Sequence, residues 1–107
     1  MSHDHKKHLA SVRSVVVKLG TQLLTDRTGR LDCTFVESIA KQVATLREKG
    51  VAVTIVSSGA IGAGVAELGL PKRPTDLARL QAVAAVGQRR LMDAWADAFE
   101  PFKLPVA

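Results

Sequence analysis

Two short segments of the sequence combine hydroxyl side chains with glycines, and the first segment also contains a lysine. Groups of these kinds can hold a phosphate or another anion. The segments are Lys18–Thr21 and Ser57–Ala60. In the first, a lysine followed closely by Gly and Thr can place an ammonium, free N–H groups and a hydroxyl around a phosphate. In the second, Gly59 allows close approach, and the hydroxyls precede a predicted helix whose dipole favours an anion. The structural alternatives are an ordinary turn after a surface lysine and a glycine-rich turn needed only for packing.

Other catalytic patterns are missing from the sequence. There is no Walker-type P-loop and no G-x-S-x-G elbow, and the glycines after Ser58 reverse the dinucleotide fingerprint. The three histidines, His3, His5 and His8, all precede residue 9, which excludes a Ser-His-Asp triad. We expect them to lie in a disordered tail and predict no metal site. Cys33 has no neighbouring His, so we expect a small buried or half-buried residue.

Composition fits one small globular domain. The chain has 107 residues, 47% of them hydrophobic, and a net charge of +5. The positive charge is spread along the chain, and we read Arg89 and Arg90 as a solvated helix face, so no nucleic-acid partner is predicted. No uncharged run is long enough to span a membrane, and the single cysteine points to a reducing compartment. We expect a soluble, cytoplasmic protein.

Alternating strands and helices are predicted to position the two segments. An apolar, β-branched run at Val15–Val17 leads into Lys18–Thr21, and Val51–Val56 leads into Ser57. Both runs are typical of strands buried on two faces of a parallel sheet. The helix between them is predicted to begin at a capping box of Thr34 and Glu37 and to end before Gly50. The candidate segments therefore follow the carboxyl ends of two parallel strands, at the edge where open α/β sheets bind ligands.

Two helices and the start of a strand are predicted to follow. A short helix ends at Gly69, and Thr75 or Asp76 caps a long helix that closes at Pro101. Small residues over 82–87 permit close approach of another helix, within the domain or across a dimer. Residues 104–107 read as the beginning of a strand, which is no place for a domain to end. We therefore expect a polar leader over 1–12 and, over 13–107, the N-terminal part of a domain that continues.

Three motifs together resemble the amino-acid kinase family. They are Val15–Thr21, Val56–Ile61 with Gly64, and Gln81–Gln88. The match extends over nearly everything from Val15 to Phe99, and the second and third motifs resemble the members that phosphorylate glutamate. The resemblance implies a three-layer αβα sandwich with a mainly parallel sheet, here truncated. It also implies ATP-dependent phosphorylation of the γ-carboxylate of L-glutamate to glutamyl 5-phosphate, the first step of proline biosynthesis.

The resemblance also assigns roles to residues. Lys18 is the expected catalytic charge and, with Gly20 and Thr21, the expected ATP phosphate site, whereas Ser58, Gly59 and Ala60 are the expected glutamate site. Mg²⁺ is expected to bind through the ATP phosphates. Further expectations are feedback inhibition by proline, a homo-oligomer at full length, and a fragment that is inactive alone. The kinase half of a bifunctional pyrroline-carboxylate synthase fits equally well, and the alternative of another class is a non-catalytic anion-binding or assembly module that uses the same loops.

Overall fold

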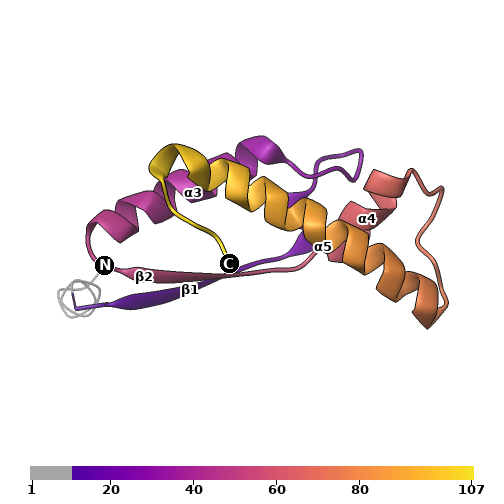
Figure 1. Cartoon of the computed structure of the whole chain (residues 1–107), viewed down its shortest axis with the longest axis horizontal. Coiled ribbons are helices and arrows are strands. Elements are labelled where there is room, and N and C mark those ends of the chain that lie inside the picture. The colour runs from indigo at the N-terminus through magenta and orange to yellow at the C-terminus, as the bar shows by residue number, and fades with distance from the viewer. Residues whose placement is uncertain (1–10) are drawn as a thin grey trace.

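Two parallel strands form the floor on which the helices lie (Figure 1). The computed structural model describes residues 11–107, so His3, His5, His8 and nearly all of the predicted leader lie outside the described residues. Strand β1 (Ser14–Leu19) pairs with β2 (Ala52–Ser57), with Val15 opposite Val53 and Lys18 opposite Val56. Helix α3 (Cys33–Glu48) connects them, as the sequence predicts, and the parallel α/β architecture is confirmed.

The helices cover one face of this sheet. Val15, Val17 and Leu19 turn toward α3 and the long helix α5 (Leu77–Phe99), whereas Val16 on the other face is 69% exposed. Val56 is also exposed, because partners in a parallel register point to the same side. The prediction that both strands are buried on two faces is therefore wrong for the described residues, which form two layers and not three.

Helix ends follow side-chain caps, with one difference from the prediction. The carboxylate of Asp32 accepts a hydrogen bond from the Phe35 N–H at 3.1 Å and caps α3. The predicted cap, Thr34, is wrong because the helix begins two residues earlier, with Asp32 as its cap, and this start leaves Thr34 inside the helix. At the other end, Gly50 has φ 78°, as expected of a residue just past a helix. Asp76, one of the two predicted caps, begins α5.

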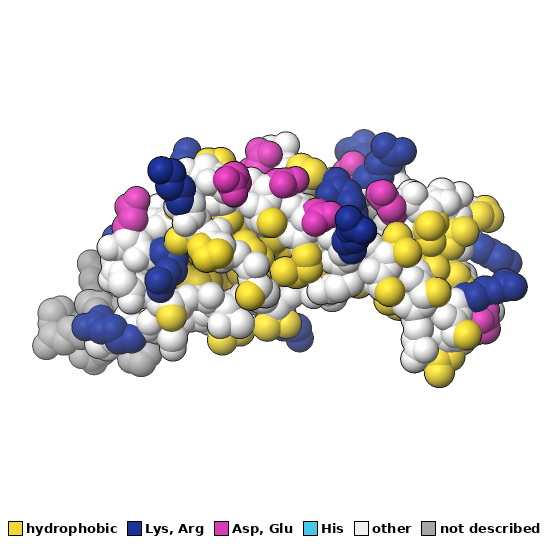
Figure 2. All heavy atoms as spheres, viewed as in Figure 1, with side chains coloured by type: hydrophobic (Ala, Val, Ile, Leu, Met, Phe, Trp, Pro, Cys, Tyr) yellow, Lys and Arg dark blue, Asp and Glu magenta, His cyan; other side chains and the backbone are white. Residues whose placement is uncertain are grey.

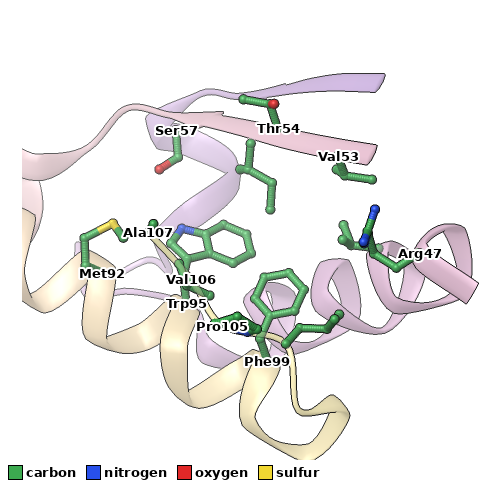
Figure 3. Close-up of a pocket in the computed structure, with 13 residues that line it drawn as sticks. Arg47, Val53, Thr54, Ser57, Met92, Trp95, Phe99, Pro105, Val106 and Ala107 are labelled. Atoms are coloured by element: carbon green, nitrogen blue, oxygen red, sulfur yellow. The ribbon is translucent and has the colours of Figure 1, made fainter. Parts of the chain in front are cut away.

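The core lies between the sheet and helices α3 and α5. Leu24, which belongs to a one-turn helix that the sequence did not reveal, α2 (Thr21–Leu24), is fully buried. Trp95 and Phe99 of α5 stack with ring centroids 6.1 Å apart and point toward β2 (Figure 3). The other members of this buried cluster are Leu19, Val36, Ala40, Val43, Leu91 and Ala98. Cys33 is exposed, contrary to the prediction, because it opens α3 ahead of the first buried residue, Val36.

Helix α4 (Ala60–Leu68) packs against the N-terminal half of α5, and the two extend to one side of the molecule (Figure 1). The chain measures 51 × 29 × 24 Å along its principal axes because of this extension. Figure 2 shows hydrophobic side chains gathered over this end, where Leu68, Leu77 and Val86 are exposed. None of the described helices is long and apolar enough to cross a membrane.

The last residues do not form the predicted strand. A 3₁₀ turn, η1 (Glu100–Phe102), follows α5, and residues 104–107 are irregular. Leu104 and Val106 pack on the core cluster without pairing with β2, and Pro105 between them has no N–H to give to a strand partner. This segment lines a cavity of about 350 Å³ beside Trp95 and Phe99 (Figure 3).

Candidate functional site

The two segments with candidate anion-binding groups begin side by side. Leu19 and Ser57 are partners at the carboxyl end of the sheet, and the Ser58 N–H donates to the Leu19 carbonyl at 3.1 Å. This bond extends the strand pairing by one step and then lets the two chains diverge into Lys18–Thr21 and Ser57–Ala60. The prediction that both segments meet at one edge of the sheet is confirmed.

A pair of hydroxyl groups joins the two segments. The Thr21 and Ser58 hydroxyl oxygens lie 3.3 Å apart, within hydrogen-bond distance, and both side chains are exposed. The Ser58 hydroxyl also donates to the Leu19 carbonyl at 3.4 Å. Each loop therefore contributes one solvent-facing hydroxyl to the same small region of the surface.

The start of α4 adds backbone donors beside these hydroxyls. Gly59, the N-cap, has φ 105°, a left-handed conformation that other residues rarely adopt. The first bond of the helix runs from the Ala63 N–H to the Gly59 carbonyl at 2.9 Å. Within residues 11–107, the N–H groups of Ala60, Ile61 and Gly62 find no acceptor. These donors and the helix dipole favour an anion beside Ser58.

Helix α5 fixes the position of this helix start. A Cβ on Gly87 would overlap the Ala60 carbonyl oxygen and lie 2.5 Å from the Gly64 nitrogen. A Cβ on Gly64 would overlap the Val83 backbone in turn. The run of small residues over 82–87 thus allows α4 and α5 to touch at their backbones, within one chain. The sequence shows the small residues, but only the fold shows that they support the Ser58–Ala60 loop.

Lys18 and Gly20 lie at the same edge but do not join the hydroxyl pair. Lys18 is exposed on the uncovered face of the sheet, and its ammonium makes no hydrogen bond or ion pair with any described residue. Gly20 has φ −79°, and a Cβ there would meet nothing within 4 Å. The structure thus brings Thr21, Ser58, Gly59 and Ala60 together and leaves Lys18 free to reach a ligand from the outer face.

A turn over residues 25–31 lies next to this site and is held by one carboxylate. The Asp26 carboxylate accepts from the Thr28 hydroxyl at 2.6 Å, the Thr28 N–H at 2.8 Å and the Arg30 N–H at 3.2 Å. These bonds, that of the Thr28 hydroxyl first, lower the pKa of Asp26 below its ordinary value of 3.8. The Gly29 N–H also donates to the Asp26 carbonyl at 3.1 Å, and Gly29 has φ 83°, a left-handed conformation that suits glycine.

The cavity beside Trp95 is separate from these groups. Its lining is largely apolar, and of the residues in the two segments only Ser57 reaches it. The Trp95 indole N–H is buried and has no acceptor among the described residues. Its one charged side chain, Arg47, donates to the Val51 carbonyl at 3.2 Å, and the hydroxyl pair and the free N–H groups of α4 lie outside the lining, so the candidate site remains at the carboxyl edge of the sheet.

Comparison with known proteins gives the family. Residues 13–107 match the profile described as the amino acid kinase family. The chain belongs to this family. It is 52% identical over 97 residues to the glutamate 5-kinase of Thermus thermophilus, and the aligned residues cover 91% of this chain and 26% of that protein. It is 50% identical over 102 residues to the glutamate 5-kinase of Citrifermentans bemidjiense, covering 95% of this chain and 27% of that protein.

Membership of the amino acid kinase family agrees with the resemblance carried by the three sequence motifs. The chain spans about a quarter of the length of the curated relatives that it matches. The family motifs map onto the elements described above: the end of β1, the loop from β2 into α4, and the part of α5 that supports α4. Sequence reasoning missed the one-turn helix α2, which places Thr21 against Ser58; the apolar pair Leu23-Leu24 was its only signal.

Proposed function

We propose that the protein carrying this chain phosphorylates the γ-carboxylate of L-glutamate with ATP, giving glutamyl 5-phosphate for proline biosynthesis. The observation that carries the proposal is the contact between the Thr21 and Ser58 hydroxyls, 3.3 Å apart. It joins two loops with anion-binding groups at one sheet edge, beside the free N–H groups of α4. The names of the relatives point to the same acceptor.

This reaction asks for positioning and charge neutralisation. A carboxylate with an ordinary pKa of about 4.3 is already ionised at neutral pH, so no general base is needed. We assign the acceptor to Ser58, Gly59 and Ala60, where a hydroxyl and backbone N–H groups can hold its carboxylate. Charge that develops on the transferred phosphoryl group is then stabilised by donors fixed in advance.

The donor side is assigned to the first loop. Lys18, Gly20 and Thr21 would hold the phosphates of ATP, with the Lys18 ammonium as the catalytic charge. The free ammonium on the outer sheet face and the open space at Gly20 suit a phosphate group. Within residues 11–107 no group of three metal-ligating side chains gathers, so Mg²⁺ would be carried by the phosphates and not by carboxylates of this segment.

The remaining expectations belong to this proposal as well. Residues 13–107 would be the N-terminal part of a kinase domain that is inactive alone. The whole enzyme would be a cytoplasmic homo-oligomer that proline inhibits, and its sheet would carry helices on both faces.

The test is glutamate-dependent formation of ADP by the natural protein, with product trapped as the hydroxamate. We expect turnover with L-glutamate and none with L-glutamine, whose amide replaces the acceptor carboxylate. Binding of ATP without any glutamate-dependent ADP would contradict the proposal and favour an anion-binding module.

A further inference from the structure

The one-turn helix α2 holds Thr21 at the junction of the two loops. The Thr21 hydroxyl lies 3.3 Å from that of Ser58. The Thr21 side chain also lies against Gly59, where an added Cβ would meet it at 3.7 Å. Thr21 therefore contacts both residues that lead the second loop into α4, and a group that fixes the Thr21 backbone also fixes how the two loops meet.

Helix α2 is too short to hold this position by itself. It has four residues, whereas isolated helices shorter than about 12–15 residues are marginal in water. Its N-cap, Gly20, makes no side-chain hydrogen bond to it. Leu24 is the buried residue of α2, and the other three are exposed. The helix therefore needs anchors from outside its own four residues.

A groove on one side of α2 offers no packed side chain for this purpose. The groove has a volume of about 560 Å³ and lies between α4 and the turn over residues 25–31. Thr21 and Thr25 line it, together with Arg30 of the turn and Arg73 beyond α4. Because this side is open, packing from the groove does not press Thr21 against the second loop.

Thr25 supplies an anchor through its hydroxyl. It is the C-cap residue of α2, and its hydroxyl donates to the Thr21 carbonyl at 3.0 Å. This hydrogen bond spans the helix from its last boundary back to its first residue. Among the described residues, no other side-chain hydrogen bond to the α2 backbone is seen. The Thr25 hydroxyl is thus the polar side-chain group that ties down the residue carrying the Thr21 hydroxyl.

Backbone bonds in turn hold Thr25. It pairs with Leu31 in an isolated antiparallel bridge, which closes the base of the turn over residues 25–31. Beside this bridge, the Asp32 N–H donates to the Leu24 carbonyl at 2.8 Å. The start of α3 therefore fixes the end of α2 and the residue that follows it. A continuous set of contacts leads from this backbone through Thr25 to the hydroxyl pair.

We propose that Thr25 is a positioning residue for the phosphates of the nucleotide, acting through Thr21. The inference rests on the proposed function, which assigns Thr21 to the ATP phosphates. The Thr25 hydroxyl is spent on the Thr21 carbonyl, so its role is to fix Thr21 before the nucleotide arrives. A donor fixed in advance loses less conformational freedom on binding, so the effect of Thr25 should appear in the affinity for ATP.

The experiment replaces Thr25 by Val in the natural protein, which removes the hydroxyl and keeps a branched side chain. We expect the KM and the Kd for ATP to rise about two- to tenfold, as for the loss of one neutral hydrogen bond. The KM for glutamate should change less than about twofold, because the Ser58 N–H keeps its own bond to the Leu19 carbonyl.

Thr45→Val is the matched control. The Thr45 hydroxyl also donates to a carbonyl four residues earlier, that of Lys41, at 3.2 Å, but on α3. The Thr45→Val variant should bind both substrates like the wild type. Thr25→Ser, which keeps the hydroxyl, should restore the affinity for ATP.

A double variant separates positioning from a general loss of stability. In a Thr21→Val background, Thr25→Val should not weaken ATP any further, because the hydroxyl that it positions is gone. A Thr25 that only stabilised the fold would lower the melting temperature and weaken ATP equally in both backgrounds.

Hydrogen exchange tests the anchor without any ligand. The Leu23 N–H donates to the Gly20 carbonyl at 3.2 Å within α2, and it should exchange faster in Thr25→Val. The Ala63 N–H, bonded to the Gly59 carbonyl at 2.9 Å, should exchange at the wild-type rate.

The outcomes separate this proposal from the proposed function. Thr25 has no positioning role if Thr25→Val binds ATP like the wild type, if the loss persists in the Thr21→Val background, or if the Leu23 exchange rate does not change. A wild type that binds ATP without turning over glutamate would remove the proposed function, and calorimetric Kd values for ATP would still decide on Thr25. A wild type that binds no ATP would overturn both.

Discussion

The Thr21 and Ser58 hydroxyl oxygens lie 3.3 Å apart although 37 positions separate the residues in the chain. The parallel register and the one-turn helix α2 together produce this contact. The register sets Leu19 beside Ser57, and α2 turns Thr21 back over the start of α4. Two loops with candidate anion-binding groups thus become one surface, on which the following predictions depend.

Replacing Ser58 by Ala in the natural protein should weaken glutamate and leave ATP nearly unchanged. The change removes one hydroxyl donor to a charged acceptor, worth about 1.5–3 kcal/mol. Steady-state kinetics with each substrate varied would measure this, with Ser38→Ala, an exposed hydroxyl on α3, as the matched control. A lower melting temperature with an unchanged KM for glutamate would leave Ser58 with a structural role alone.

Replacing Lys18 by Met should slow phosphoryl transfer by roughly two or more orders of magnitude, because the ammonium would act on transition-state charge. Met keeps much of the apolar stem, so the sheet should remain intact. Single-turnover rates at saturating substrates report this step. Lys41, exposed on α3, provides the control Lys41→Met. Near-normal turnover in Lys18→Met would make Lys18 an ordinary lysine at a strand end.

Gly87→Ala should destabilise the protein even though Ala favours helices over Gly by about 1 kcal/mol. The added methyl would overlap the Ala60 carbonyl, and overpacking of this kind costs about 1–3 kcal/mol. We also expect a higher KM for glutamate, because α4 must shift. Ala85→Leu, exposed on the same helix, should change neither quantity. Full stability and kinetics in Gly87→Ala would show that the two helices have room to separate.

The pKa of Asp26 should rise toward 3.8 in Thr28→Val, because the hydroxyl bond is the largest cause of its lowering. A lowered folded-state pKa means that this carboxylate stabilises the fold above its unfolded value of about 3.8. That stabilisation is lost as pH falls through the lower, folded value. Carboxyl-carbon NMR would follow the titration, and Thr45→Val, whose hydroxyl meets only the Lys41 carbonyl, is the control. An Asp26 pKa that does not move would assign the lowering to the backbone donors.

The 107-residue chain in isolation should melt broadly or self-associate, because one face of its sheet is uncovered. Val16 is 69% exposed and Val56 is 48% exposed on that face. Calorimetry and sedimentation would measure this, and Val16→Lys with Val56→Lys should reduce association. A sharp two-state transition of a monodisperse monomer would contradict the expectation.

Local patterns in the sequence predict the two strands, the helices α3 to α5 and the sheet edge at which the candidate site lies. Val15–Val17 and Val51–Val56 have the composition of parallel strands, and the small turn and cap residues between them set the connections. Because parallel strands place their carboxyl ends together, Lys18–Thr21 and Ser57–Ala60 had to meet. These features depend on neighbours in the chain, which a sequence shows directly.

Tertiary structure decided what depends on distant neighbours. Asp32 and Thr34 both offer a side-chain oxygen that can cap a helix, so the local sequence does not distinguish them. The path of the chain into the helix selects Asp32. Gly87 could have served a dimer, but α4 occupies its surface. Arg73 and Arg30, 43 positions apart by their numbers, line one groove because the turn over 25–31 folds against α4. Burial, close approach and uncompensated charge are properties of the assembled surface, so no local pattern encodes them.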